Sequence, residues 1–132
     1  MIIEAYCSYE VSKLLKEKGF DEPCLQMWEC GPDKKYLFRL QSSCYQNITE
    51  EDSCLAPTHQ MAMKWLREVH NVFIYIEPFI TTNGLQGYKP YCTKIGGEFM
   101  WINPLRKYSN TSSDTHEEAV EVALKYCLEN LI

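Results

Sequence analysis

The amino-acid sequence predicts an α+β fold in which three helices pack on a mostly antiparallel sheet of about five strands, arranged in hairpins. Three segments repeat apolar residues at helical spacing and carry start and stop residues. Between them lie short β-branched and aromatic runs, separated by turns that contain glycine or proline. A composition of 45% hydrophobic and 23% charged residues is ordinary for a globular protein. We therefore expect one α+β domain spanning residues 1–132.

The first helix is expected between Ser8, a suitable N-cap, and Gly19, which supplies the C-terminal stop. Phe20 follows the glycine and is expected to fold back onto the helix. The apolar stripe of this helix consists of Val11, Leu14 and Leu15.

The second helix is expected to start at residues 56–58, with Pro57 in the first turn, and to end at Asn71. We expect Trp65 to be buried, and Lys64 and Arg67 to be solvated. The predicted buried face consists of Met61, Ala62, Trp65, Leu66 and Val69, with Lys64, Arg67, Glu68 and His70 lying off it.

The third helix carries the clearest start signal. Thr115 with Glu118 forms a capping-box pattern, and Asp114 with Glu117 offers a rival register. Acidic residues near this start, among them Glu121, suit the positive end of the helix dipole. The predicted core side consists of Ala119, Val122, Ala123, Tyr126, Cys127 and Leu131.

Two hairpins are predicted. In the first, strands 24–30 and 36–41 flank a turn at 31–34; in the second, strands 91–95 and 98–102 flank Gly96-Gly97.

A further strand over 72–80 contains Pro78, so an edge position or a bulge is expected there. Polar connections are expected at 42–55 and 103–114.

The net charge and the cysteines limit which partners and which cellular compartment we expect. A net charge of −5 disfavours nucleic acid and anionic membranes. Residues 60–107 include six basic and three acidic residues. A solvent-exposed face explains this mild positive charge better than a surface that binds nucleic-acid phosphates. Seven cysteines, odd in number and without a Cys-x-x-Cys pair, indicate thiols in a reducing cytoplasm, since Glu4 interrupts any signal segment. No apolar run reaches the roughly 20 residues of a membrane span.

Two groups of residues are candidates for a reactive site or a metal site. Cys54 precedes the second helix and His59 follows in its first turn, which a thiol–imidazole nucleophile would require. An exposed thiol and a surface histidine explain the same pair. A metal site is disfavoured because its ligand spacings are wide and irregular. Its candidate ligands are Cys24, Cys30, Cys44, Cys54 and His59.

The remaining patterns assign no further site. The acidic run Glu50, Glu51 and Asp52 fits a solvated loop, and Gly96-Gly97 lies in a hairpin and not between a strand and a helix. We therefore assign no catalytic, cofactor-binding or metal-ligating residue and expect no cofactor.

Aromatic residues make up 13% of the chain, more than its core requires. Tyrosine and tryptophan are typical of protein interfaces, and they also line the wet faces of sheets. The aromatic residues on predicted strands or their margins are Trp28, Tyr36, Tyr75, Tyr88, Tyr91 and Tyr108.

Helix caps and core faces in all three predicted helices carry a resemblance. The segments are 14–20, 56–58, 60–62, 64–68, 114–115, 117–119, 123–125 and Leu128. They resemble short uncharacterised proteins of gut-bacterial phages and prophages. The resemblance implies a shared fold and carries no catalytic residue across.

The sequence therefore predicts a non-enzymatic, phage-type accessory protein that binds another protein or itself, with a homodimer possible. The alternatives are a small nucleic-acid-binding accessory domain, or an enzyme whose site cannot be read from the sequence.

Overall fold

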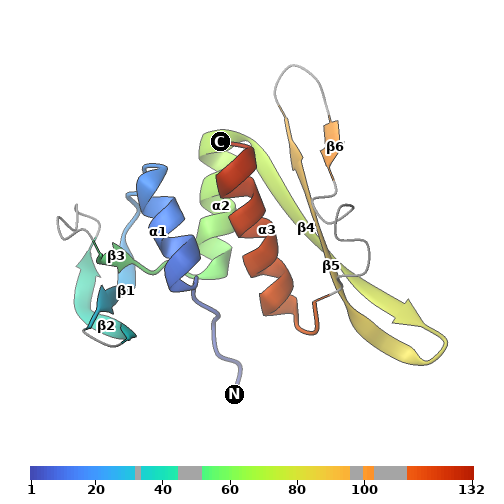
Figure 1. Ribbon diagram of the computed structural model, residues 1–132, viewed down its shortest axis with the longest axis horizontal. Coiled ribbons are helices and arrows are strands. Elements are labelled where there is room, and N and C mark those ends of the chain that lie inside the picture. The colour runs from blue at the N-terminus through green and yellow to red at the C-terminus, as the bar shows by residue number, and fades with distance from the viewer. Residues whose placement is uncertain (32–33, 45–51, 96–99, 103–112) are drawn as a thin grey trace. The chain divides into compact units, whose positions relative to one another are not determined.

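The computed structural model describes residues 1–31, 34–44, 52–95, 100–102 and 113–132. It confirms the α+β class, with three helices and antiparallel strands (Figure 1). The residues gather into two compact units, Met1–Ala62 and Met63–Ile132. The expectation of one domain over residues 1–132 stays a prediction.

The prediction of a single sheet of about five strands is wrong. Among the described residues there are two three-stranded antiparallel sheets, one in each unit. Their strand orders are β2-β1-β3 and β4-β5-β6. Each sheet consists of one long hairpin completed by a short third strand, which hairpin signals alone do not reveal.

Helix α1 (Tyr9–Glu17) of the first unit has the predicted boundaries. The Ser8 hydroxyl accepts a hydrogen bond from the amide of Val11, and Gly19 adopts a φ of 92°, which favours glycine. The amide of Phe20 donates to the Leu15 carbonyl, and the Phe20 side chain is buried. The expected return of Phe20 onto the helix is thereby confirmed.

The first predicted hairpin is also confirmed. Strands β1 (Cys24–Cys30) and β2 (Lys35–Cys44) pair antiparallel. The predicted connection at 42–55 is too long at both ends, because β2 continues to Cys44 and a two-residue strand, β3 (Cys54–Leu55), pairs with the other side of β1. Residues 45–51 lie outside the described residues.

Helix α2 (His59–His70) begins two residues after Pro57, and not with that proline in its first turn. Thr58 is the cap, since its hydroxyl accepts from the amide of Met61. Pro57 stays outside the helix because residues 5–7 run antiparallel to 57–59, with the amide of Cys7 bonded to the Pro57 carbonyl.

Trp65 and Leu66 are buried, and Lys64 and Arg67 are exposed, as predicted for α2. Val69 is not on the buried face, because 55% of it is exposed. The ring of His70 lies 4.7 Å from that of Trp65 instead, just before the chain turns at Asn71 with a φ of 56°.

The sheet of the second unit is a meander of β4 (Val72–Thr81), β5 (Gly84–Lys94) and β6 (Met100–Ile102). The expectation that β5 starts at Tyr91 is wrong, because β5 begins at Gly84 and pairs with β4 along its length. Asn83-Gly84 is a strong hairpin signal that the sequence prediction overlooked. The Gly96-Gly97 turn lies outside the described residues.

Helix α3 (His116–Asn130) packs against β4 and β5 (Figure 1). Thr115 is the N-cap, since its hydroxyl accepts from the amide of Glu118. The Thr115 register is therefore confirmed over the one starting at Asp114. The Glu118 carboxylate accepts from the Asp114 amide, one residue before the position that a capping box predicts.

The predicted core side of α3 is partly wrong. At about 100° per residue, the buried positions form two adjacent rows, and Val122 points to the opposite side, where it is exposed. Tyr126 and Leu131 are only half-buried. The buried residues are Ala119, Val120, Ala123, Leu124, Cys127 and Leu128.

Candidate functional site

The β4–β5 hairpin has one face turned to α3. Residues paired directly across an antiparallel ladder point to the same face. On this face, the ring of Tyr88 lies 5.7 Å from that of His116, and the ammonium of Lys94 donates to the Leu131 carbonyl at 2.7 Å. Cys92 shares this face and is hydrogen-bonded to Cys127.

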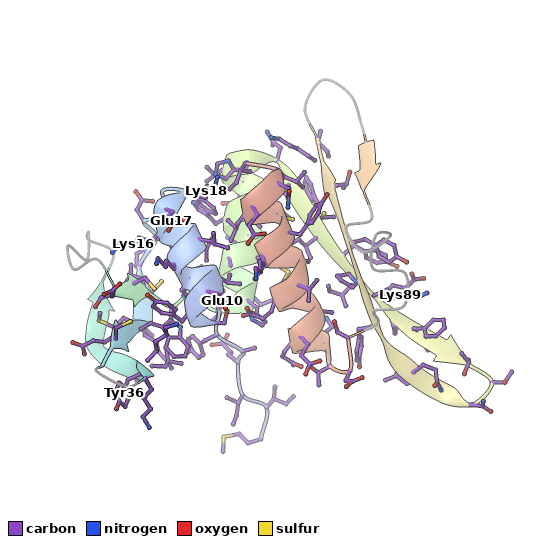
Figure 2. All side chains as sticks on the ribbon, viewed as in Figure 1. Glu10, Lys16, Glu17, Lys18, Tyr36 and Lys89 are labelled. Atoms are coloured by element: carbon purple, nitrogen blue, oxygen red, sulfur yellow. The ribbon has the colours of Figure 1, made fainter. Side chains whose placement is uncertain are left out.

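The opposite face of the hairpin carries a row of aromatic side chains. Phe73, Tyr75 and Phe79 alternate along β4, and Tyr91 pairs with Tyr75 across the ladder. The two tyrosine rings lie 5.8 Å apart, and 51% of Tyr75 is exposed. The ammonium of Lys89, labelled in Figure 2, lies 4.2 Å from the centroid of the Phe79 ring. We call the face that carries this aromatic row the outer face of the sheet.

Strand β4 is an edge strand of its sheet among the described residues. The amide of Ile95 donates to the Asn71 carbonyl, so residues 71 and 95 form a hydrogen-bonded pair. Such pairs recur at every second residue of a ladder, which directs the polar backbone groups of Phe73, Tyr75 and Glu77 towards β5. Those of the alternate residues point outward. These alternate residues, which we call the outward row of β4, are Val72, Ile74, Ile76 and Pro78.

Pro78 fits this edge because its missing N–H belongs to the outward row and costs the ladder no hydrogen bond. The predicted edge position is confirmed. The register also shifts between Phe79 and Ile80, so an irregularity accompanies the proline as expected.

The turn end of the hairpin extends beyond α3 (Figure 1). It carries two further apolar side chains. Ile80 and Leu85 pair across the ladder and are 67% and 54% exposed. Contiguous exposed apolar surface on a small protein marks a site of interaction. The outward row of β4, the outer face and this turn end together form the candidate interaction surface.

Of the aromatic residues that were selected from the sequence and that the structure describes, only Tyr75 and Tyr91 lie on this surface. Tyr88 faces α3. In the first unit, the indole N–H of Trp28 donates to the Cys7 carbonyl at 2.9 Å, so this tryptophan has an internal role. Tyr36 projects from β2 and is exposed (Figure 2). Tyr108 lies outside the described residues.

Phe73 and Phe79 were not selected from the sequence, although their spacing carried the signal. They stand two residues before and four residues after Tyr75, which places all three on one face of a strand.

The Cys54–His59 hypothesis of a nucleophilic site gains no support. Cys54 is buried in β3, and this burial raises the pKa of its thiol to about 11, although nearby Lys16 acts in the opposite direction. A thiol with such a pKa is protonated at neutral pH, and the thiolate is the nucleophile.

His59 lies instead close to Cys7, whose sulfur is within 4.8 Å of the imidazole. The Cys7 thiol donates to the Thr58 carbonyl at 4.0 Å and is fully buried. Cys7 could not be selected from the sequence, because the pairing of residues 5–7 with 57–59 leaves no local pattern. A buried thiol that donates to a carbonyl is a core group.

The structure does not gather the cysteines proposed as metal ligands. Among the described residues, Cys24, Cys30, Cys54 and His59 do not supply three ligand atoms around one point. The side chain of Cys44 is outside the described set.

The acidic run at 50–52 and the first turn of α3 form no further site among the described residues. Asp52 is exposed, and its neighbours Glu50 and Glu51 are not described. Glu117 and Glu118 lie in the first turn of α3.

The basic stretch 60–107 does not present its described lysines together. Lys64 pairs with Glu68 at 3.8 Å, Lys89 lies over Phe79, and Lys94 binds the Leu131 carbonyl. Arg106 and Lys107 are outside the described residues. The described lysines therefore give no support to the nucleic-acid alternative.

The chain matches no protein-family model, no curated protein and no solved structure. Within the described residues, none of the helices has the length and apolar character that crossing a bilayer demands.

Proposed function

We propose that the chain is a non-enzymatic binding module that associates with a second copy of itself through the edge of β4 and the aromatic outer face beside it. The observation that carries this proposal is the outward row of β4. Ten residues form this edge strand, and Pro78 is the one residue in it that blunts pairing. An unblunted edge is a template for another strand.

A second copy suits this edge because two antiparallel β4 strands are related by a two-fold axis, the commonest symmetry of oligomers. The axis would place the aromatic row of one chain beside that of its partner. Aromatic pairs across neighbouring strands contribute roughly 0.2–1 kcal/mol each. Glu77 is the only charged residue of β4, so repulsion along the edge is small.

Charge substitutions at Tyr75 test the proposal. Its side chain is exposed and its backbone faces β5, so Tyr75→Lys and Tyr75→Glu leave the ladder intact. Near the two-fold axis, each variant sets like charges against each other. We expect the unmodified protein to show twice its 15.5 kDa mass by light scattering, each variant alone to show 15.5 kDa, and an equal mixture of the variants to recover the doubled mass.

Tyr36→Lys is the matched control, since it introduces the same charge at an exposed tyrosine of the other sheet. This variant should remain dimeric. A mass of 15.5 kDa for the unmodified protein at every micromolar concentration contradicts self-association. In that case a different protein must be sought for the surface. Dissociation by the control variant as strong as that by Tyr75→Lys would place the contact elsewhere.

The resemblance of the helices to short phage and prophage proteins supports a role as an accessory protein of that type in the cytoplasm. Genomic neighbours test this part of the proposal. A position among replication, packaging or lysis genes supports it, and an unrelated chromosomal setting in all carriers contradicts it.

A further inference from the structure

Helix α3 is fixed to β5 at both of its ends. Near its start, Ser113 exchanges two backbone hydrogen bonds with Tyr88, and the ring of His116 lies against the Tyr88 ring. At its C-terminal end, the Leu131 carbonyl accepts from Lys94. The helix therefore runs alongside β5 between these two anchors.

The spacing between the anchors sets Cys127 opposite Cys92. From Tyr88 to Lys94, β5 rises about 20 Å at about 3.3 Å per residue. From His116 to Leu131, α3 rises about 22 Å at about 1.5 Å per residue. Cys92 stands about two-thirds of the way along the first interval and Cys127 about three-quarters of the way along the second.

Both cysteines are buried, Cys92 on the face of the sheet that is turned to α3 and Cys127 on the buried side of the helix. The two thiols lie close enough that a hydrogen bond between them is the largest cause of the pKa shift of each, in agreement with this placement. Two thiols held in such contact need no large rearrangement of the chain to bond to each other.

We propose that Cys92 and Cys127 form an oxidation site, at which hydrogen peroxide converts the two thiols into a disulfide that ties α3 to β5. The Cys92 sulfur attacks one peroxide oxygen and breaks the O–O bond, which gives a sulfenic acid and a molecule of water. The Cys127 sulfur then attacks the Cys92 sulfur and expels the oxygen, which leaves as water with the Cys127 proton. Two thiols and one peroxide thus give one disulfide and two waters.

The hydrogen bond distinguishes the roles of the two sulfurs. The Cys127 thiol donates, which lowers the pKa of Cys92 and raises that of Cys127. The Cys127 thiolate is further disfavoured because it lies near the negative C-terminal end of α3. Cys92 is therefore the attacking sulfur and Cys127 the resolving one. Burial excludes bulky reagents from the pair, and peroxide is small enough to enter when the packing opens locally.

Peptide mapping of the full chain tests the site without any substitution. Trypsin leaves the Lys89–Pro90 bond intact, so Cys92 lies in peptide 68–94 and Cys127 in peptide 126–132, each with one cysteine. After peroxide treatment and alkylation of the remaining thiols, we expect these two peptides to be linked, with a mass two hydrogens below their sum, and to separate on reduction.

Cys127→Ser removes the resolving thiol. In this variant, peroxide should leave a sulfenic acid on Cys92, which dimedone captures when the protein is unfolded in its presence. Cys24→Ser, which removes a buried thiol from the other unit, should leave the link between 68–94 and 126–132 unchanged. If Cys127→Ser does not fold, the peptide map of the unmodified chain decides alone. Oxidation that links other cysteines, or that leaves both peptides unlinked, overturns the proposal.

Discussion

Two substitutions at neighbouring positions of β4 separate its inward row from its outward row. The amide of Glu77 points to β5, where it pairs with Lys89, so Glu77→Pro removes a ladder hydrogen bond. Pro78→Ala adds an N–H to the outward row and leaves the ladder unchanged. Glu77→Pro should therefore act mainly on stability, and Pro78→Ala mainly on association.

The loss of the Glu77 bond, with the Lys89 carbonyl left without its partner, costs about 1–3 kcal/mol. Pro78→Ala costs about 0.4–1 kcal/mol, because the unfolded chain gains conformational freedom. With a urea dependence of roughly 1–3 kcal/mol per molar, Glu77→Pro should lower the unfolding midpoint by about 1 M, and Pro78→Ala by less than half of that. Pro78→Ala should also tighten the self-association.

Urea unfolding followed by circular dichroism at low protein concentration measures the first effect, and light scattering over a dilution series measures the second. A larger loss of stability for Pro78→Ala than for Glu77→Pro would show that the inward and outward rows are interchanged. The candidate edge would then be the wrong side of β4.

Four further substitutions test the packing and the electrostatics. Leu124→Ala should lower the unfolding free energy by about 2–5 kcal/mol, whereas Val122→Ala should change it by less than about 1 kcal/mol. The reason is that only Leu124 is buried. Equal losses of unfolding free energy, measured by calorimetry, would place the buried face of α3 elsewhere. Thr115→Ala should cost about 0.5–2 kcal/mol through the lost cap, and a neutral effect would refute its role. The pKa of Cys54 rises from 9.0 to about 11, so between pH 9 and 11 the unfolded chain releases a proton that the folded chain retains, and stability should fall over this window. Cys54→Ala should reduce that fall, and an equal fall in the variant would assign it to other groups.

Local signals in the sequence predicted those parts of the fold that depend on neighbouring residues. Ser8, Gly19 and Thr115 act as caps or stops because their side chains or φ angles satisfy groups a few residues away. Pro78 indicated an edge for the same reason, since a missing N–H is tolerated only where no ladder bond is needed.

The sequence predictions fail where contacts between distant segments of the chain determine the local structure. The strand character of Cys54–Leu55 depends on pairing with β1, and the approach of Cys7 to His59 depends on residues 5–7 lying beside 57–59. The partition of the six described strands into two sheets has the same origin. The exposure of Val122 has a different cause. No physical rule forbids an apolar side chain on the solvent side of a helix, so its apolar character did not indicate burial.

Amide hydrogen exchange along β4, resolved by residue with NMR, tests the proposed edge most directly. In dilute protein, the inward amides of Phe73, Tyr75 and Glu77 should be protected, while the outward amides of Ile74 and Ile76 should exchange rapidly. At concentrations where light scattering reports twice the 15.5 kDa mass, Ile74 and Ile76 should become protected as well. Rapid exchange of these two amides in the dimer would contradict an interface built on the β4 edge.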